Sequence, residues 1–437
     1  MPNIRAVSAP LAAGYRERPL WHDGVIADAD RPPEAHPLPP ARADVVIVGA
    51  GYCGVTAAAG LARRGRTVVV VDAADRGVGA STRNGGMVIP ELKHGPDALS
   101  RRHGALGRAL VQGVLDAYAF LRDLVVEEAI ECHWRESGGL LLAHHPRHVP
   151  ALRDATAEWS AWGEPVRILD RDALRAEVGS DAYYAGFLLE HTAAVQPAEL
   201  HAALVARAVS AGVVVHHRTR VTRLERRLDR FRVQTTRGDI DAGDVLVATN
   251  AYVDGVLAPL QRRVLPIGSF IIATEPLPDD VARSVMPGNR MCFDTKHLLN
   301  YWRLSPDGRM VFGGRTSLSS STVAEARDLL HAQMVRVHPQ LAGVDLTHAW
   351  GGSVAVTLDR LPHCGRIDDV AYATGCNGTG VALATWFGER AAAWMTAEDN
   401  PPAFAELAFR PIPFRRLRRW WLPPAGRALQ LADRYGR

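Results

Sequence analysis

The sequence predicts an α/β chain, α+β overall, in which a Rossmann-like nucleotide-binding domain is interleaved with a domain built on an antiparallel sheet. Two glycine-rich turns, at residues 49–54 and 375–380, each follow an apolar strand-like run and precede a helix-like run. Between them, residues 262–356 consist mainly of short strand-like runs. We therefore expect the chain to leave the first domain, build the second and return.

The first glycine-rich turn has the features of a dinucleotide site. In the stretch 43–72, Gly49 permits a tight turn, Gly51 lets backbone N–H groups approach a pyrophosphate, and Gly54 lets the following helix pack closely on the strand. The helix N-terminus then faces the phosphates. Asp72, at the end of the next strand, can accept hydrogen bonds from a ribose diol. The turn predicts a bound dinucleotide, with NAD and FAD both open; the alternative is a βα turn without a ligand.

Composition narrows the class of protein. The 437 residues exceed one ordinary domain, and 47% hydrophobic with 22% charged residues is typical of a soluble enzyme. A net charge of +4 is too mild to indicate nucleic acid. We find no apolar run of membrane-spanning length and no signal-peptide pattern. The five cysteines are scattered, which favours thiols in a reducing cytoplasm.

Residues 1–40 are predicted to form an N-terminal arm. Five prolines in 31–40 indicate an extended linker, and Trp21 is expected to anchor the arm on the body. Helices are expected at 106–129, 197–211, 323–337 and 381–395, the third being the one helix within 262–356. Strands are expected at 138–143, 213–216, 219–224, 231–236, 244–249, 264–274, 291–294, 299–304, 310–313, 349–357 and 369–374.

Two other clusters of residues are candidate sites. His144, His145 and His148 lie on a proline-containing loop without a carboxylate or thiol partner, so we predict no metal site. Residues 411–437 hold seven arginines and one acid, together with Trp420 and Trp421. Such a tail either lies on an anionic membrane or packs its tryptophans on the body.

The loop after Asp72 carries a resemblance to a known family. Its GAS-x-RNGG sequence, at 79–86, is followed by a VIP-x-LK segment at 88–93. Small residues there let the backbone lie flat against a planar ligand. In these motifs the chain resembles the FAD enzymes of the D-amino-acid oxidase/glycine oxidase superfamily, and most of all the gamma-glutamylputrescine oxidase branch. The resemblance runs from about Asp44 onward.

The resemblance implies a division of the chain. The FAD-binding domain is expected at 41–99, 190–261 and 350–400, the substrate domain at 100–189 and 262–349, and a basic tail at 401–437. Because the family has a similar helical tail, we favour packing of the tail tryptophans over a membrane contact.

The resemblance also implies FAD as the dinucleotide. Covalent-flavin branches attach the ring through a cysteine upstream of the second glycine turn, but residues 353–357 hold none and Cys364 follows Pro362. Non-covalent FAD is therefore expected. Asp72 stands where the family more often has glutamate, so its ribose contact is expected to be slightly shifted. The predicted FAD contacts are Gly49, Gly51, Tyr52, Cys53, Gly54, Asp72, Ala80, Ser81, Arg83, Asn84, Gly85, Gly86, Met87, Val221, Gly375, Asn377, Gly378, Thr379 and Gly380.

Two of these contacts have an alternative. The family match gives Val221 a backbone contact to adenine, although an ordinary strand residue would look the same. The turn at 375–380 is expected to aim a helix N-terminus at the pyrimidine edge of the flavin, where it would stabilise the negative charge of reduction. The alternative is a plain strand-to-helix turn.

The implied reaction is oxidation of a C–N bond in a small amine or amino acid. A hydride passes to flavin N5, the resulting imine is hydrolysed, and O₂ is the expected electron acceptor. The alternatives are a dehydrogenase on the same fold that passes electrons to a carrier or quinone, and a flavin-binding partner subunit without turnover.

Four residues are candidates for the chemistry. Strand alternation places Tyr301 and Arg303 on one face, where Arg303 either clamps a substrate carboxylate or forms a structural ion pair. His363 either lies near the flavin ring or caps a turn, and we favour the turn. Lys93, one of two lysines in the chain, matches a lysine of the resembling branch. It either stabilises superoxide beside the flavin or is a solvated surface residue.

Overall fold

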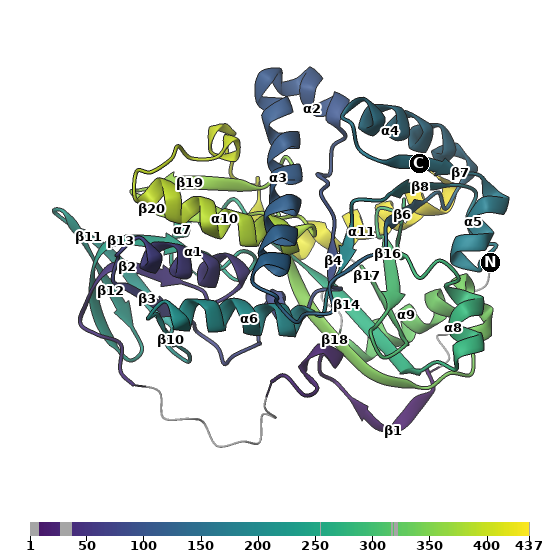
Figure 1. Ribbon diagram of the computed structural model, residues 1–437, viewed down its shortest axis with the longest axis horizontal. Coiled ribbons are helices and arrows are strands. Elements are labelled where there is room, and N and C mark those ends of the chain that lie inside the picture. Colours follow the sequence, from purple (N-terminus) through teal and green to yellow (C-terminus); the bar gives the residue numbers. More distant parts are fainter. Residues whose placement is uncertain (1–7, 27–36, 254, 316–317, 319–321, 437) are drawn as a thin grey trace.

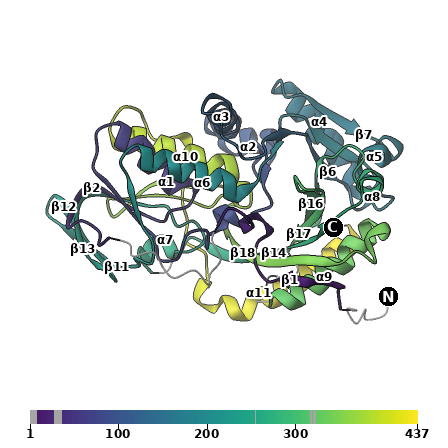
Figure 2. The ribbon, with the colours of Figure 1, turned by 60° about the horizontal axis from the view of Figure 1, so that its bottom comes forward.

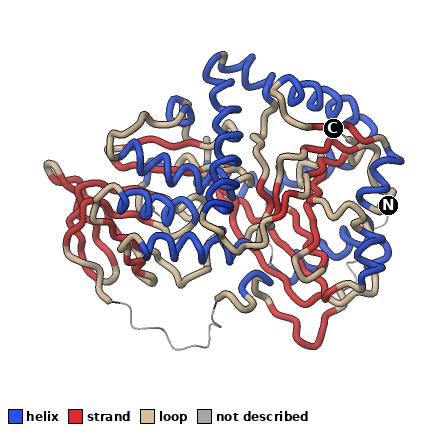
Figure 3. Tube along the Cα trace, in the orientation of Figure 1, coloured by secondary structure: helices blue, strands red, loops and turns tan. Residues whose placement is uncertain are grey.

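The computed structural model contains two large sheets, one small sheet and the helices that pack on them (Figure 1). The structure describes residues 8–26, 37–253, 255–315, 318 and 322–436. One sheet lies mainly on the left of Figure 1 and the other on the right, with α3 (Ala105–Glu127) running between their helical layers. The secondary structure is shown in Figure 3.

The first sheet has eight strands around a parallel centre. Its order is β10-β3-β2-β13-β12-β11, with β20 beside β13 and β19 beside β20. The pairings among β10, β3, β2, β13 and β20 are parallel. Valine-rich β2 and β3 are largely buried, as the strands of a covered parallel sheet are. The strands are β2 (Arg42–Val48), β3 (Val68–Val71), β10 (Val214–His216), β11 (Val221–Arg227), β12 (Arg230–Thr235), β13 (Gly238–Val247), β19 (His363–Ile367) and β20 (Val370–Thr374).

Three helices form one layer beside this sheet: α1 (Tyr52–Arg63), α6 (Pro197–Ser210) and α10 (Gly380–Met395) (Figures 1 and 2). The two helices that follow the glycine turns, α1 and α10, cross closely because Gly388 has no side chain. A Cβ there would lie 2.4 Å from the carbonyl oxygen of Cys53. The layer therefore brings the two glycine turns, more than 300 residues apart, to one edge of the sheet.

The second sheet has nine strands in the order β1-β18-β14-β17-β16-β15-β6-β8-β7. It is largely antiparallel, but β1 pairs parallel with β18 and β15 parallel with β6. The strands are β1 (Leu11–Arg16), β6 (Gly139–Leu142), β7 (Val166–Leu169), β8 (Gly186–Leu189), β14 (Leu265–Pro276), β15 (Met291–Asp294), β16 (Asn300–Leu304), β17 (Arg309–Gly314) and β18 (Leu346–Val356). A small third sheet joins β4 (Met87–Val88), β9 (Ala193–Ala194) and β5 (Arg135–Glu136).

The remaining helices lie outside the layer of α1, α6 and α10. They are α2 (Pro96–His103), α4 (Val149–Ala161), α5 (Arg171–Val178), α7 (Ala258–Gln261), α8 (Asp279–Val285), α9 (Val323–Val337) and α11 (Arg418–Tyr435). Leu260 of α7 packs in the core of the eight-stranded sheet. The prediction of one helix within 262–356 was wrong, because α8 precedes α9. With seven residues, α8 is too short to show a clear helical period.

The N-terminal arm differs in part from its prediction. It contains strand β1, which extends the larger sheet, rather than irregular chain alone. Most of the proline-rich linker at 31–40 lies outside the described residues. Trp21 does anchor the arm: its side chain is 2% exposed, its indole N–H donates to Asn84 O at 2.8 Å, and its ring meets Trp350 edge-on at 6.1 Å.

The arm is expected to stabilise the whole protein through Trp21. Trp21→Ala should lower the free energy of unfolding by about 3–5 kcal/mol, because it removes a fully packed ring and leaves Asn84 O without its donor. Trp420→Ala is the matched control, since Trp420 is 81% exposed and its loss should change stability by less than about 0.5 kcal/mol. Urea unfolding of both variants measures this. Equal effects would contradict the anchoring role.

Candidate functional site

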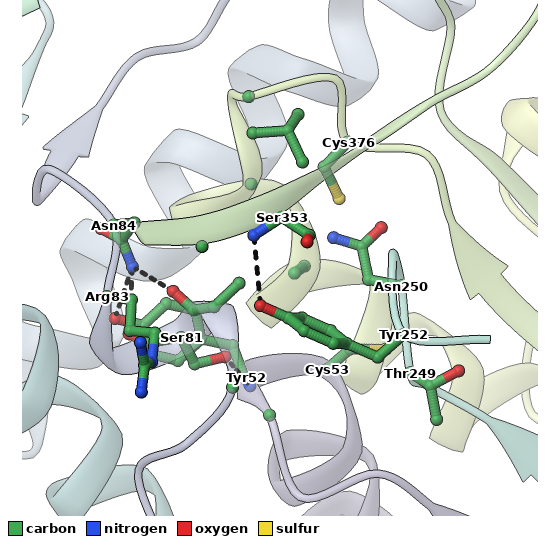
Figure 4. Close-up of a pocket in the computed structure, with 18 of the residues that line it drawn as sticks. Tyr52, Cys53, Ser81, Arg83, Asn84, Thr249, Asn250, Tyr252, Ser353 and Cys376 are labelled. Atoms are coloured by element: carbon green, nitrogen blue, oxygen red, sulfur yellow. Dashed lines mark hydrogen bonds between the residues drawn. The ribbon is translucent and has the colours of Figure 1, made fainter. Parts of the chain in front are cut away.

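A pocket of about 490 Å³ is lined by residues of both large sheets. This volume is in the range of small-molecule and cofactor sites. Its walls come from the two glycine turns, the loop at 78–87, and strands β14, β16 and β18. Figure 4 shows part of this lining, in which the backbone N–H of Ser353 donates to the hydroxyl of Tyr252 at 3.2 Å.

The first glycine turn is held by steric fit and by Asp72. Gly49 has φ of 107°, which favours glycine, and a Cβ on Gly54 would lie 1.9 Å from Gly49 O. The Asp72 carboxylate accepts from Ala50 N at 2.8 Å and from Ala74 N at 2.9 Å. A carboxylate oxygen can accept more than one bond, so Asp72 retains capacity toward a ribose hydroxyl in the pocket.

The loop at 79–87 is docked on the start of α1. Ser81 Oγ accepts from Tyr52 N at 3.0 Å, and a Cβ on Gly51 would lie 2.9 Å from that same oxygen. Asn84 then closes the loop on itself, because its side chain donates to Ser81 O at 3.0 Å and accepts from Gly86 N at 2.8 Å. Gly51 therefore leaves room for the side chain of Ser81 beside the start of α1.

Four successive carbonyl groups of this loop accept hydrogen bonds from behind. The donors come from four different parts of the chain. The bonds are Trp350 Nε1 to Arg83 O (2.8 Å), Trp21 Nε1 to Asn84 O (2.8 Å), Arg303 Nε to Gly85 O (2.7 Å) and Val195 N to Gly86 O (2.9 Å). The other side of the loop, including Arg83, Asn84, Gly85 and Met87, lines the pocket.

Arg303 lies behind the loop and does not line the pocket, so its prediction as a carboxylate clamp is wrong. Its side chain is 2% exposed and also donates to Val195 O at 2.6 Å, and its guanidinium lies 4.9 Å from the centre of the Trp21 ring. Among the described residues it forms no ion pair, which is the contact that the alternative predicted. Burial lowers the pKa of Arg303 to about 9. Strand alternation predicts the face of β16 on which Arg303 lies, but it does not predict how deeply the side chain is buried.

Tyr301, two residues before Arg303 on β16, does line the pocket. Its ring fits between two glycines: a Cβ on Gly85 would lie 2.9 Å from the ring, and one on Gly313 would lie 2.4 Å from it. Its hydroxyl is 3.2 Å from Ser269 Oγ. Burial raises the pKa of Tyr301, so the phenol is neutral and can donate a hydrogen bond.

The second glycine turn places the start of α10 at the pocket. Asn377 has φ of 50° and Gly378 has φ of 105°. The turn is held by Asn250 Oδ1, which accepts from Gly375 N at 3.0 Å, and by Asn377 N, which donates to Ala355 O at 3.1 Å. Asn377 to Gly380 line the pocket, as does Val221 at the start of β11. Of the predicted contacts, Gly54, Gly86 and Gly375 do not line the pocket; a Cβ on Gly86 would lie 2.2 Å from Val195 O, and one on Gly375 would lie 2.5 Å from Thr357 Cγ2.

His363 is also outside the pocket, so its prediction as a catalytic residue is not supported by its position. It is 1% exposed, and its Nε2 lies 3.1 Å from both carboxylate oxygens of Asp359. Its ring stacks on Phe409 with centroids 4.0 Å apart. The turn between Asp359 and His363 brings the two together, and His363 holds that turn.

Two charged residues of the pocket, Glu91 and Arg315, are not predicted by the sequence motifs. They line it together with Lys93. Burial raises the pKa of Glu91, with Lys93 opposing, and burial with the nearby charge of Arg360 lowers the pKa of Arg315. Burial lowers the pKa of Lys93 to about 8. The available signals were weak: Glu91 is the variable position of VIP-x-LK, and Arg315 directly follows the paired glycines that end β17.

The three histidines considered for metal binding instead lie beside the C-terminal helix. His144 Nδ1 and His148 Nδ1 are 2.9 Å and 2.7 Å from Thr295 Oγ1, and His144 Nε2 is 3.0 Å from Asp433 O. Gly436 packs against His145. The loop therefore holds the end of α11.

Among the residues that the structure describes, none of the helices combines the length and the apolar character that a membrane span requires.

Comparisons with known proteins give a consistent family. The model of the DAO family, described as FAD dependent oxidoreductase, matches residues 44–394. The chain is 32% identical to the gamma-glutamylputrescine oxidoreductase of Escherichia coli over 90% of this chain and 93% of that protein. Its fold is similar to the crystal structures of glycine oxidase from Geobacillus kaustophilus (TM-score 0.75, 20% identity, 85% of this chain and 99% of that one) and of L-proline dehydrogenase from P. horikoshii (TM-score 0.69, 20% identity, 83% and 96%).

The position of Arg303 predicts that lysine cannot replace it. Arg303→Lys should lower the free energy of unfolding by about 2–4 kcal/mol, because one ammonium cannot reach the carbonyls of Gly85 and Val195 while stacking on Trp21. Arg283→Lys is the control, since Arg283 is exposed and its ion pair with Asp279 is 4.0 Å long. Urea unfolding compares them; an effect no larger than the control's would contradict the assignment.

Proposed function

The chain belongs to the DAO family of FAD-dependent oxidoreductases, and from this premise we propose that it oxidises a C–N bond of an amine or amino acid by hydride transfer to the flavin. The observation that carries the proposal is the shared pocket. It is lined both by the two glycine turns and by a charged cluster of Lys93, Glu91 and Arg315, in which Lys93 interacts electrostatically with the other two. Cofactor and substrate groups thus have adjoining places in one cavity.

The glycine turns and the loop fit a flavin dinucleotide. A Cβ on Gly54 would clash with Gly49 O, the positive φ of Gly49 favours glycine, and Asp72 faces the same cavity with a carboxylate that binds backbone N–H groups. We assign the first turn and α1 to the pyrophosphate, Asp72 to a ribose, and the start of α10 to the negative edge of the flavin. When bound there, FAD supplies the acceptor for the hydride that leaves the substrate carbon.

The charged cluster of Lys93, Glu91 and Arg315 fits a substrate that carries both an amine and a carboxylate. Arg315 has no hydrogen-bonded or ion-paired partner for its guanidinium among the described residues, so its donors are available to a carboxylate. Tyr301 can add a phenolic hydrogen bond. Glu91 is the acid of this lining group and can accept a proton from the substrate ammonium, because a raised pKa makes a carboxylate a stronger base. The neutral amine then holds the lone pair that drives hydride loss.

The names of relatives support an amine or amino-acid substrate, but they do not decide which electron acceptor reoxidises the flavin. The Escherichia coli relative is named for a gamma-glutamyl amine, and the glycine oxidase neighbour is named as an oxidase. We propose O₂ as the acceptor, with Lys93 stabilising the negative charge that oxygen gains. The L-proline dehydrogenase neighbour favours the second candidate, a dehydrogenase that delivers electrons to a carrier or quinone. Release of peroxide on aerobic turnover separates the two.

Substrate class is tested by anaerobic bleaching of the flavin with polyamines, N-alkyl amino acids, amino acids and gamma-glutamyl amines. We expect bleaching by amines that carry a carboxylate. Arg315→Met should weaken the apparent affinity for these about 10- to 100-fold, which corresponds to a lost bidentate ion pair of about 1.5–3 kcal/mol. A bleaching diamine without a carboxylate serves as the control. If Arg315→Met weakens both alike, the carboxylate role is wrong; if no compound bleaches the flavin, the proposed oxidation is wrong.

Reoxidation by O₂ should depend on the charge of Lys93. Its pKa of about 8 means that the ammonium is present below that pH and is lost above it, so the rate constant should fall as pH rises through about 8. Lys93→Met should react more slowly and without this step. The other lysine offers the control: Lys296→Gln keeps a donor toward Asp294, outside the pocket, and should retain the pH step. Stopped-flow mixing of reduced enzyme with O₂ measures both, and an unchanged rate in Lys93→Met would remove the role.

A further inference from the structure

An exposed apolar row precedes and begins α11. Phe414, Leu417 and Trp420 are 76%, 53% and 81% exposed. They recur at every third residue, and the chain from 415 to 435 is helical, so the side chains of Leu417 and Trp420 point to similar sides. We call residues 414–420 the basic aromatic edge. The expectation that both tail tryptophans pack on the body was wrong for Trp420.

Arginines alternate with this apolar row. Arg415 is tied to the body through Val264 O at 2.7 Å, whereas Arg416, Arg418 and Arg419 form no ion pair within the described chain. The tail from 411 to 437 contains one acid, Asp433, and that carboxylate is bound to His297 near the other end of α11. The basic aromatic edge therefore keeps its positive charge.

The edge is presented by a fixed helix. On the opposite side of α11, Leu422 packs with Leu265 and Ile267 of β14, and Trp421 donates to Phe414 O at 3.2 Å. Figure 2 shows α11 along the lower border of the molecule, below the larger sheet. Because β14 continues from these contacts to Ser269 and Ile271 in the pocket wall, the edge and the pocket lie along one strand.

We propose that the basic aromatic edge binds the surface of an anionic lipid membrane. Trp420, Phe414 and Leu417 would lie at the boundary between the lipid headgroups and the acyl chains, where aromatic side chains are favoured. The arginines would bind the lipid phosphates. A second copy of this chain fits poorly, because it would bring two arginine-rich edges together. This contact is independent of the oxidation proposed above and places the pocket beside the membrane.

Flotation of the full-length flavin-loaded protein with lipid vesicles tests the proposal. We expect it to float with phosphatidylcholine vesicles that contain phosphatidylglycerol and to stay behind with phosphatidylcholine alone. High salt should release it. Trp420→Ser with Leu417→Ser, and separately Arg416→Gln with Arg419→Gln, should each weaken binding at least about tenfold.

Two control variants remove equivalent groups elsewhere. Arg101→Gln with Arg102→Gln removes two exposed charges on α2, and Leu228→Ser removes a side chain that is 98% exposed. Both should bind like the original protein. Absence of binding, equal binding to neutral vesicles, or equal losses in controls and edge variants would overturn the proposal. So would sedimentation showing a dimer that Trp420→Ser dissociates, because the edge would then join two copies. Amine oxidation in buffer, measured separately, should be unchanged in every variant.

Discussion

The pocket depends on the hydrogen bonds that hold the loop at 83–86 from behind. Each carbonyl group of the loop has a donor, and the donors come from the arm, from β16, from β18 and from the segment before α6. A buried carbonyl that loses its donor costs about 1–3 kcal/mol. The loop therefore keeps one position, and the groups it shows to the pocket are placed before any ligand arrives.

The same loop explains why glycines gather on both sides of Tyr301. Gly85 belongs to the loop and Gly313 to β17, and a methyl group at either would overlap the phenol ring. Because Gly85 and Gly313 have no side chains, the space between them fits the ring of Tyr301 and fixes its orientation. The ring is then fixed by shape, while its hydroxyl meets Ser269. A neutral, oriented donor is thus obtained without a charged partner.

The sequence was sufficient for elements whose signal is local. Turn glycines, Asp72, and the helix at 323–337 follow from residue spacing alone, and the structure has α9 with those bounds. The positions of Arg303 and His363 relative to the pocket depend on residues that are distant in the sequence. Both lie one short strand or turn from the pocket, and whether they enter it depends on Trp21, Asp359 and Phe409, which come from other elements. Glu91 and Arg315 were missed for the same reason, since their importance arises from sharing a cavity.

Strand β1 and Trp21 have a consequence for the order of folding. Leu11 pairs with Leu346, and Ala9 N donates to Asp328, so this segment of the arm finds its partners more than 300 residues later in the sequence. Contacts of such sequence separation form late, because a long loop must close first. Trp21 reaches Asn84 only when the arm is in place. During synthesis on the ribosome, the cofactor loop must therefore wait for strand β18 before its last donor arrives.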